Sequence, residues 1–425
     1  MIEHILTTLY VGILYIYSYV FNVIFCRNEI QHYTYFISKL TETNMLFVKF
    51  MQWFASNDMS YEVKTLIRSF ADNVPFMNSD IEYEQIADLI QIAANQNKIL
   101  TINTQPINAG TIALVYEGYL DGEPIILKQM RKNVSQELKS SIELMKFMAE
   151  VSLYIPYLKL FKMNEVIKYN EETLMKQIDF KTEIANGKAF YQAFFDHKDI
   201  IIPKIYDDIT EYYPNFILME RIIGMRAQDV SDDDVENYCM TYNTVLIQSL
   251  IKRGIVHADL HIGNIFFMKD YKVGLIDFGN VLYIDNVMMK KLSLFYKFLF
   301  NRQVHKLCKF FIDHTLKYNN PDQDQKLADE KKDIVIKGIK KAFEKGNILS
   351  GSKPMNIYVM LDINDILSAI DAKLDEEFMN VILAIGPMSS VVSILKRNDK
   401  NNSLKRVFLG HVKDSIPETL KNYDE

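Results

Sequence analysis

The sequence predicts an α+β fold in which a small antiparallel sheet is followed by a larger, mostly helical region. Residues 112–128 read as two strands on either side of Asp121-Gly122, a dipeptide that suits the tight turn of a β-hairpin. The regions before this hairpin and after Tyr238 show apolar residues at helical spacing instead. The 425 residues correspond to about two to three domains.

An uncharged, apolar stretch occupies residues 5–26. A helix of this length rises about 33 Å and could cross a hydrocarbon core of about 30 Å. Glu3 precedes the stretch and Arg27, Lys39 and Lys49 follow it, so the charge bias places the rest of the chain on the cytosolic side. We expect a single-pass membrane anchor here. The alternative is a buried or peripheral helix, because tyrosines at 10, 15, 17 and 19 suit an interface.

The remaining elements follow in order along the chain. Helical spacing returns between residues 135 and 195, and residues 200–219 read as strand, loop and strand. The helices after Tyr238 are interrupted once, by a predicted hairpin over residues 265–276. The expected domains are the anchor at 1–27, a helical extension at 28–100, a lobe with the sheet at 101–224 and a mostly helical lobe at 225–425.

Aromatic residues at helical spacing in the last region are expected to form core stripes rather than a lipid pocket. They are Phe295, Phe298, Phe300, Phe310 and Phe311.

Composition excludes several functional classes. The 48 Lys and Arg against 54 Asp and Glu give a net charge of −6, which argues against a generally basic nucleic-acid binder. The three cysteines, Cys26, Cys239 and Cys308, lack the spacing of a disulfide framework or a structural zinc site, so a reducing compartment is expected. Only 15 glycines are present, so any phosphate-binding loop must be poor in glycine.

Two short motifs, HADLHIGN from His257 and LIDFG, flank the predicted hairpin at residues 265–276. A four-residue turn would pair Met268 with Val273 and place Asn264 opposite Asp277. An amide oxygen and a carboxylate at one point are hard ligands suited to Mg²⁺. Asn264 and Asp277 are therefore the predicted metal ligands.

Asp259 lies five residues before Asn264, on the loop that leads into the hairpin. From there it could accept a proton from a substrate hydroxyl or orient it. This Asp and Asn, followed by Asp-Phe-Gly after an apolar strand, match the signature of protein kinases. The motif set therefore predicts a bilobal protein-kinase-like fold, and an Asp-Asn turn with a chance DFG is the alternative.

Further candidates lie upstream. Lys128 ends the second strand of the first hairpin, which is the position of the kinase lysine that contacts nucleotide phosphates. We expect its partner to be Glu183 on a following helix, with Asp179 one turn earlier on the same face. Met219 and Glu220 end an apolar strand, where a connection between lobes would present backbone groups to adenine.

Together these residues resemble the UbiB/AarF family of atypical, ADCK-type kinase-like proteins over roughly residues 49–280. HADLHIGN is similar to the family's HADPHPGN loop, and QIDFKTEIAN, residues 177–186, to its E-L-D-F-x-x-E-A-x-N helix. The family has an alanine-rich loop in place of a glycine-rich one, and residues 106–113 correspond to it. The resemblance implies nucleotide contacts at three residues of this loop, Ala109, Gly110 and Thr111.

The resemblance also implies regulatory residues. Lys49-Phe-Met-Gln52 is similar to the family's K-x-G-Q signature, which would make Lys49 and Gln52, together with Asp179 of the E-x-D motif, regulatory. The implied cofactors are ATP and Mg²⁺, with Glu183 paired to Lys128. The implied role is connected with isoprenoid quinone or lipid metabolism at a membrane, and no motif identifies the acceptor substrate.

The chain departs from the family pattern at three places. Gly110 and Thr111 stand where the family has Ala and Ser, and Gly would permit a positive φ in the loop. Gln177 replaces the glutamate of E-x-D, which weakens the charge pairing expected with Lys49. Met51 replaces the glycine of K-x-G-Q, which puts the close approach of that helix in doubt.

Three functions are compatible with the sequence. The preferred one is a membrane-associated atypical kinase or ATPase that binds Mg-ATP. The second is a nucleotide-binding pseudokinase scaffold, which the loss of the E-x-D glutamate favours. The third is a small-molecule phosphotransferase, which shares the H-x-D and Asn loop but has no use for a segment such as Lys49 to Gln52.

Overall fold

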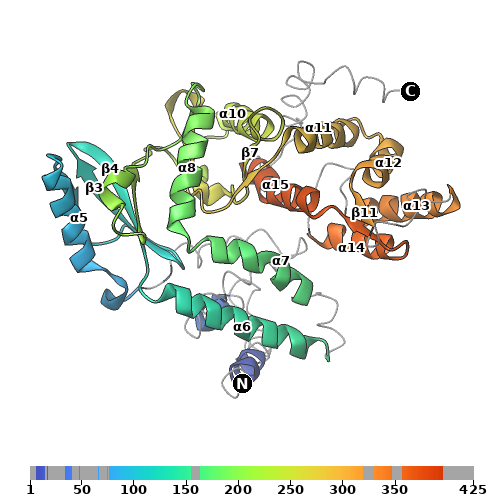
Figure 1. The fold of residues 1–425 in the computed structure, drawn as a ribbon, viewed down its shortest axis with the longest axis horizontal. Coiled ribbons are helices and arrows are strands. Elements are labelled where there is room, and N and C mark those ends of the chain that lie inside the picture. The colour runs from blue at the N-terminus through green and yellow to red at the C-terminus, as the bar shows by residue number, and fades with distance from the viewer. Residues whose placement is uncertain are drawn as a thin grey trace. The chain divides into compact units, whose positions relative to one another are not determined.

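The chain divides into two compact units in the computed structural model (Figure 1). The first comprises Met1–Ile184 and Lys204–Arg221, and the second comprises Ala185–Pro203 and Ile222–Glu425. Each unit has its own sheets and its own hydrophobic core. The structure describes residues 6–14, 17, 34–40, 47, 66, 74, 76–154, 163–318, 329–346 and 357–395.

An antiparallel sheet forms the centre of the first unit. Its strands are β1 (Leu100–Ile102), β2 (Asn108–Ala109), β3 (Ala113–Leu120), β4 (Glu123–Met130) and β6 (Phe216–Glu220). The spatial order is β1, β3, β4 and β6, and β2 pairs with β3. The predicted hairpin is confirmed: Asp121 and Gly122 have φ of 53° and 88° and join β3 to β4. Positive φ at both turn residues matches the twist of the two strands.

Different helices cover the two faces of this sheet. Helix α5 (Tyr83–Asn95) buries Leu89 and Ala93 against the face that carries Leu127. Phe180, at the start of helix α8 (Phe180–Phe194), packs with Ile126 on the opposite face. Side chains alternate along a strand, so Lys128 lies on the same face as Ile126 and looks toward α8.

The helical spacing predicted before residue 195 is confirmed. Helices α6 (Val134–Ser152) and α7 (Met163–Lys176) precede α8, and α6 packs against α7. A one-turn helix, α9 (Asp207–Thr210), lies in the loop before β6.

Residues 6–14 are helical and pack one side against α6. Leu14 is buried in a cluster with Leu138 and Ile142 of α6. The other side carries exposed apolar residues, including Leu9 and Ile13 at 57% and 66% exposure. Among the described residues, no helix combines the length and the apolar character needed to span a bilayer. Most of the predicted anchor at residues 5–26 lies outside the described residues.

Two small sheets position the loops of the second unit. Strand β7 (Ile255–His257) pairs with β10 (Val281–Tyr283). Strand β9 (Val273–Leu275) lies between β5 (Ile200–Ile201) and β8 (Ile265–Phe267). Helix α10 (Val235–Gln248) continues into a wide turn, Ser249–Arg253, that ends at Gly254 and leads into β7. The loops after β7 and after β9 carry the two chemical motifs.

The register of the β8–β9 hairpin differs by one residue from the predicted one. Phe267, not Met268, pairs with Val273. The connection is one residue longer than predicted because Asp270 and Tyr271 both adopt left-handed φ, of 58° and 56°. Asn264 therefore lies opposite Ile276, whose N–H donates to the Asn264 carbonyl oxygen at 3.0 Å, and not opposite Asp277.

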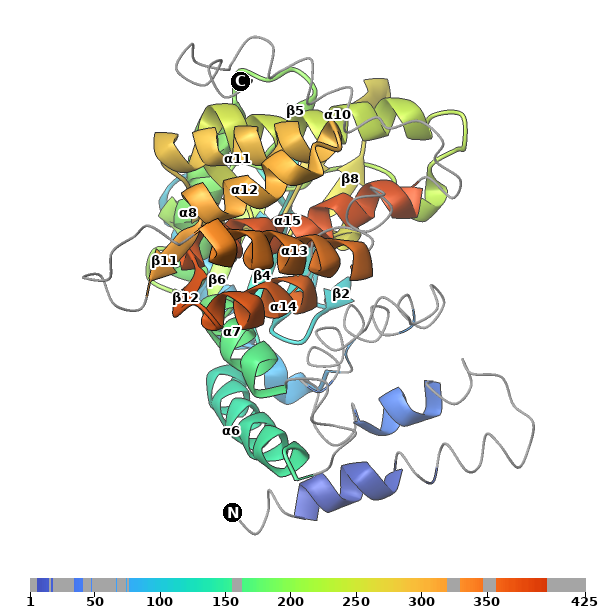
Figure 2. The ribbon, with the colours of Figure 1, turned by 90° about the vertical axis from the view of Figure 1, so that its right-hand side faces the viewer.

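Helices dominate the rest of the second unit, and consecutive helices from α11 to α14 stack in sequence order (Figure 2). They are α11 (Asn286–Phe300), α12 (Val304–His314), α13 (Asp329–Lys345), α14 (Ile357–Ser368) and α15 (Glu376–Leu395). The sequence predicted one interruption after Tyr238, but the structure adds the pair β7 and β10 and the antiparallel pair β11 (Leu316–Tyr318) and β12 (Ala372–Leu374).

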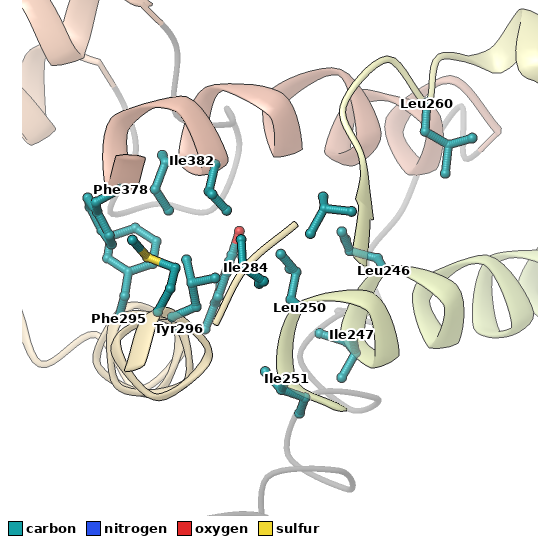
Figure 3. Close-up of a cluster of buried hydrophobic side chains, with 14 of the residues drawn as sticks. Leu246, Ile247, Leu250, Ile251, Leu260, Ile284, Phe295, Tyr296, Phe378 and Ile382 are labelled. Atoms are coloured by element: carbon teal, nitrogen blue, oxygen red, sulfur yellow. The ribbon is translucent and has the colours of Figure 1, made fainter. Parts of the chain in front are cut away.

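The core of this unit gathers side chains from α10, α11 and α15 (Figure 3). The prediction that the phenylalanines are core residues is confirmed for Phe295, Phe298, Phe310 and Phe311, which are all buried. The side chain of Phe300 lies outside what the structure describes. This core underlies the β7 and β10 strands, so the loops beside them rest on a packed base.

Candidate functional site

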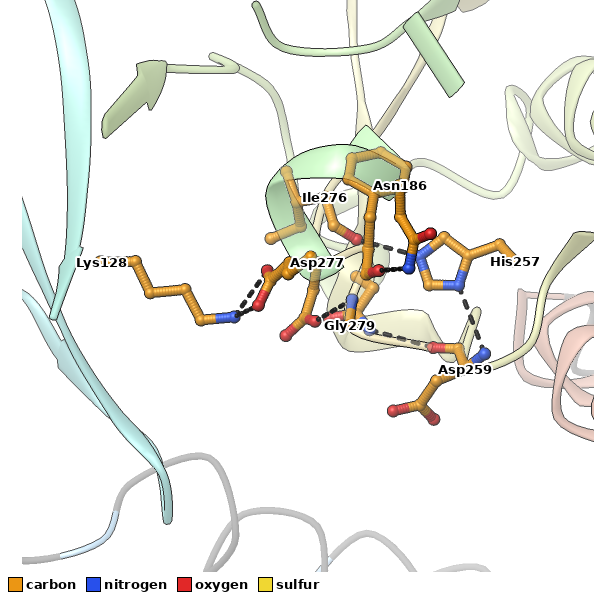
Figure 4. Close-up of polar contacts among 10 residues, drawn as sticks. Lys128, Asn186, His257, Asp259, Ile276, Asp277 and Gly279 are labelled. Atoms are coloured by element: carbon orange, nitrogen blue, oxygen red, sulfur yellow. Dashed lines mark hydrogen bonds and ion pairs between the residues drawn. The ribbon is translucent and has the colours of Figure 1, made fainter. Parts of the chain in front are cut away.

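A buried ion pair joins strand β4 to helix α8 in the first unit. Lys128 Nζ lies 2.8 Å from both carboxylate oxygens of Glu183, which is only 3% exposed (Figure 4). The ammonium also lies 5.1 Å from the centre of the Phe180 ring. Breaking a pair in such a setting is costly, because it leaves one charge buried and unpaired. The pair therefore fixes the direction of the Lys128 side chain.

Asp179 caps helix α8. Its Oδ1 accepts the N–H of Thr182 at 3.0 Å, and its Oδ2 accepts the Thr182 hydroxyl at 2.6 Å. These hydrogen bonds to the charged form lower the pKa of Asp179. The sequence placed Asp179 inside the helix, but it precedes α8 as the capping residue. The regulatory candidates Lys49 and Gln52 lie outside the described residues.

The predicted phosphate loop is the turn between β2 and β3. The N–H of Gly110 donates to the carbonyl oxygen of Ala113 at 2.9 Å, and the neighbours Ala109 and Thr111 are buried. Gly110 does not adopt a positive φ, and a Cβ on it would meet only the Ala113 oxygen, at 3.6 Å. The positive φ that glycine would permit at this position is therefore not used.

Met219 and Glu220, the predicted adenine contacts, end strand β6. The N–H of Glu220 donates to the carbonyl oxygen of Lys204 at 2.8 Å, and the next N–H, of Arg221, donates to Pro124 at 3.1 Å. The Glu220 carboxylate accepts the N–H of Lys204 at 3.1 Å. The two backbone donors at this position are thus already used within the first unit.

The loop that follows β7 in the second unit is organised by His257, which the sequence analysis did not select. His257 is fully buried, with Nε2 3.2 Å from the Ile276 carbonyl oxygen and Nδ1 accepting the N–H of Asp259 at 3.3 Å. Both bonds require a neutral imidazole with its proton on Nε2. Burial lowers the pKa of His257 and favours this form. Asp259 is therefore held by its backbone, and the same histidine contacts Ile276, the residue before Asp277.

Asn264 ends the same loop and is 6% exposed. Its Nδ2 donates to the carbonyl oxygen of Asp259 at 3.0 Å. Just before it, Nδ1 of His261 accepts the N–H of Gly263 at 3.0 Å and caps the one-turn helix Ile262–Asn264. The side-chain nitrogen of Asn264 is used inside the loop. The side-chain amide oxygen, Oδ1, is therefore the group that suits a metal ion.

Asp277 has a left-handed backbone, with φ of 63°. Non-glycine residues in this region are strained and cluster at functional sites. Its Oδ1 accepts the N–H of Gly279 at 3.4 Å. An Asp carboxylate and an Asn amide oxygen are donor types that suit Mg²⁺, which takes one or two protein oxygens and completes its shell with water and phosphate.

Asn186, on α8, holds the segment after Asp277. Its Nδ2 donates to the Phe278 carbonyl oxygen at 2.9 Å, and its Oδ1 accepts the hydroxyl of Tyr283 at 3.0 Å. The Phe278 ring packs 5.1 Å from Phe190 of the same helix. The sequence signal for Asn186 was its place as the last residue of the QIDFKTEIAN segment, one helical turn after Glu183.

Arg226 is another residue that was not selected from the sequence. Its Nη1 donates to the carbonyl oxygen of Gly263 at 2.7 Å, and its guanidinium lies 4.0 Å from the centre of the Phe266 ring. Both partners belong to the second unit and flank Asn264 and Ile265. Arg226 therefore braces the end of the loop that carries Asp259.

Comparison with known proteins gives a consistent assignment. The family model described as the ABC1 atypical kinase-like domain matches residues 69–311, which is more than half of the chain. The "Probable protein kinase UbiB" of Shewanella baltica (strain OS185) is 25% identical over 227 residues. The protein of the same name from Shewanella sp. (strain MR-7) is 26% identical over 227 residues. Each alignment covers 50% of this chain and 40% of the relative, so the chain matches less than half of these relatives' length.

Two solved structures show a distant likeness. One is Rv3197 of Mycobacterium tuberculosis in complex with erythromycin, at TM-score 0.41 and 15% identity over 68% of this chain and 78% of that one. The other is the Rio2 kinase of Chaetomium thermophilum in an ADP/Mg²⁺-phosphoaspartate complex, at TM-score 0.32 and 12% identity over 83% and 84%.

Proposed function

The chain belongs to the ABC1 family of atypical kinase-like proteins, and we propose that it is a phosphotransferase that binds Mg-ATP. The observation that carries the proposal is the ion pair between Lys128 and the buried Glu183. A lysine held in one direction by a buried carboxylate is the arrangement that protein kinases use on nucleotide phosphates.

Each remaining residue has a proposed role. Asn264 and Asp277 would hold Mg²⁺ through one amide and one carboxylate oxygen, and bound Mg²⁺ would offset charge on the phosphates. The loop at Ala109, Gly110 and Thr111 contacts the phosphates through backbone groups, and Met219 and Glu220 lie beside adenine. Asp259 accepts the proton of an acceptor hydroxyl as that oxygen bonds to the γ-phosphorus and the bond to ADP breaks.

The test is Mg²⁺-dependent ATP turnover by the full chain. We expect Lys128→Met and Asp277→Asn each to lower turnover by about 100-fold or more, because each removes a preorganised charge. Lys98→Met, which removes an exposed ion pair with Asp208 in the first unit, is the matched control and should keep full turnover.

Three other outcomes would change the assignment. Melting-temperature shifts with Mg-ATP but no turnover would indicate a pseudokinase scaffold. Turnover that requires a small hydroxyl compound would indicate a small-molecule phosphotransferase. No response to Mg-ATP in binding or turnover would refute nucleotide chemistry at these residues.

We also propose that the full chain associates with membranes and acts in isoprenoid quinone or lipid metabolism. The apolar side of the helix at residues 6–14 supports the membrane part, because Leu6, Leu9 and Ile13 are each more than half exposed. Flotation of the full chain with phospholipid vesicles tests it. Leu9→Asp with Ile13→Asp should abolish flotation without lowering the melting temperature, and unchanged flotation would contradict this role for the helix.

A further inference from the structure

The turn at residues 109–112, within the predicted phosphate loop, is held by Arg131 directly at one end and through Val74 at the other. The backbone N–H of Arg131 donates to the carbonyl oxygen of Ile112 at 2.9 Å. Its guanidinium Nη2 donates to the carbonyl oxygen of Val74 at 3.0 Å. The N–H of Val74 in turn donates to the carbonyl oxygen of Ala109 at 2.8 Å. The two turn residues between these anchor points are Gly110 and Thr111.

The guanidinium of Arg131 cannot swing away without a large penalty. Arg131 is 3% exposed, and its Nη1 lies 3.2 Å from Oδ2 of Asp80. The carbonyl oxygen of Asp80 accepts Nε2 of the fully buried Gln129 at 2.8 Å, and Oε1 of Gln129 accepts the Tyr116 hydroxyl at 3.1 Å. A buried polar network in which these members bond to one another is rigid. The guanidinium that donates to the Val74 carbonyl oxygen is therefore fixed in position.

Strand β4 carries Lys128 on one face and the residue next to it, Gln129, on the other. Lys128 lies on the face of β4 that packs against α8, whereas Gln129 lies on the α5 face. Arg131 follows directly after β4 and joins the network on the side of Gln129. Strand β4 thus carries the lysine for the phosphates and, three residues later, the residue that fixes the loop.

We propose that Arg131 is a positioning residue for nucleotide binding: together with Val74 and Asp80 it holds the Ala109–Ile112 turn in its phosphate-binding shape. A loop that is already ordered loses less conformational entropy when a ligand binds, so affinity rises without a new contact. These contacts also tie the loop to the chain segment at Val74. The inference rests on the proposed nucleotide function.

The experiment uses the full chain in four forms: wild type, Arg131→Met, Arg131→Lys and the control Lys98→Met. Hydrogen exchange measured by mass spectrometry reports on peptides that cover residues 74–81 and 107–113, without nucleotide. Binding of Mg-ATP is measured by calorimetry on the same samples. Peptides from the β3–β4 hairpin, residues 114–129, show whether each variant is folded.

We expect Arg131→Met to speed exchange at 74–81 and 107–113 by at least tenfold while the hairpin peptides stay protected. Its Kd for Mg-ATP should rise by at least tenfold. Arg131→Lys keeps the charge opposite Asp80 but loses the second donor, so it should rescue folding and give an intermediate Kd. Lys98→Met should match wild type within twofold in both measurements.

Two results would contradict the proposal that Arg131 holds the loop in place. One is an Arg131→Lys or Arg131→Met protein with protected hairpin peptides and unchanged exchange at residues 107–113. The other is faster exchange in that loop with a Kd within twofold of wild type. If the wild type binds no nucleotide, the proposed function fails, but the exchange measurement still decides whether Arg131 orders the loop.

Discussion

Two side chains fix the backbone on either side of Asp277. His257 bonds the carbonyl oxygen of Ile276, and Asn186 donates to that of Phe278. A strained left-handed residue persists only where its surroundings over-determine it, and here both neighbouring carbonyls are held. The orientation of the carboxylate proposed to bind the metal is thus set by residues distant in sequence.

Asn186→Asp tests one of these two contacts. The change keeps the shape of the side chain but removes the Nδ2 donor and places a carboxylate oxygen against the Phe278 carbonyl. We expect the free energy of unfolding to fall by about 1–3 kcal/mol, the cost of an unsatisfied buried acceptor. Urea denaturation at pH 7 measures it. The exposed Asn237→Asp on α10 is the control, and equal effects for both would contradict the assigned contact.

The buried His257 predicts a pH dependence of stability. Its pKa in the folded state is lowered by burial, so below its unfolded pKa of about 6.5 the unfolded state binds a proton that the folded state does not. Stability should therefore fall as pH decreases from 7 toward 5. His257→Gln should reduce the slope of unfolding free energy against pH, whereas His305→Gln on the exposed side of α12 should leave it unchanged.

Gly110 should tolerate a side chain. Its φ lies outside the left-handed region and a Cβ would make an ordinary contact with the Ala113 oxygen. Gly110→Ala should therefore raise the free energy of unfolding by about 0.4–1 kcal/mol, because alanine restricts the unfolded chain. Thermal unfolding of the Gly110→Ala variant measures this change. Gly122→Ala is the comparison, and it should have the opposite effect. Gly122 has φ of 88°, so alanine there should destabilise the hairpin turn.

The candidate site was only partly predictable from single residues. Asp259 and Asn264 could be selected because their spacing is local in sequence, and Lys128 and Glu183 because each lies in a short recognisable segment. The contacts that hold the site, such as Asn186 with Phe278, join residues 92 positions apart and leave no local pattern. They depend on how strands and helices pack.

At the scale of elements, a strand pairing could be predicted only where the turn between the strands has a recognisable sequence. The β3–β4 hairpin was predictable because Asp121-Gly122 dictates a two-residue turn. The register of β8–β9 was not, because Asp270 and Tyr271 adopt left-handed φ with no glycine to signal it. A shift of one residue moves every side chain to the other side of the pair, so this turn determines what lies opposite Asn264.

The cap at the N-terminus of α8 should contribute to the stability of the fold. Asp179 satisfies the backbone N–H and hydroxyl of Thr182 just before Glu183 enters its ion pair. Asp179→Ala should lower the free energy of unfolding by about 1 kcal/mol, while Asp179→Asn should keep most of it. Chemical denaturation of both variants measures the difference. Equal losses in the two would mean that the side chain acts by charge rather than as a cap.

In the whole molecule, the helices beyond the matched family region share a core with those inside it. The match ends at residue 311, within α12. Phe378 of α15 packs its ring 5.7 Å from Phe295 and 5.8 Å from Phe311. Helices α13 to α15 therefore complete the core of the second unit and do not form a separate domain.

Phe378→Ala tests this shared core. The side chain is fully buried, so its removal should lower the free energy of unfolding by about 3–5 kcal/mol. Calorimetry of the full chain should show the second unit melting at a lower temperature. Phe195→Ala, at a ring that is 72% exposed in the same unit, should change little. Matching shifts for the two variants would argue that α15 is not part of this core.

The ion pair between Arg131 and Asp80 also has an evolutionary consequence. Losing either partner alone leaves a buried charge, whereas exchanging both removes the two charges together. Stepwise replacement of both residues must therefore pass through a destabilised protein in which only one of them has changed. Related sequences should either retain both residues or have replaced both, and the two positions should drift together rather than singly.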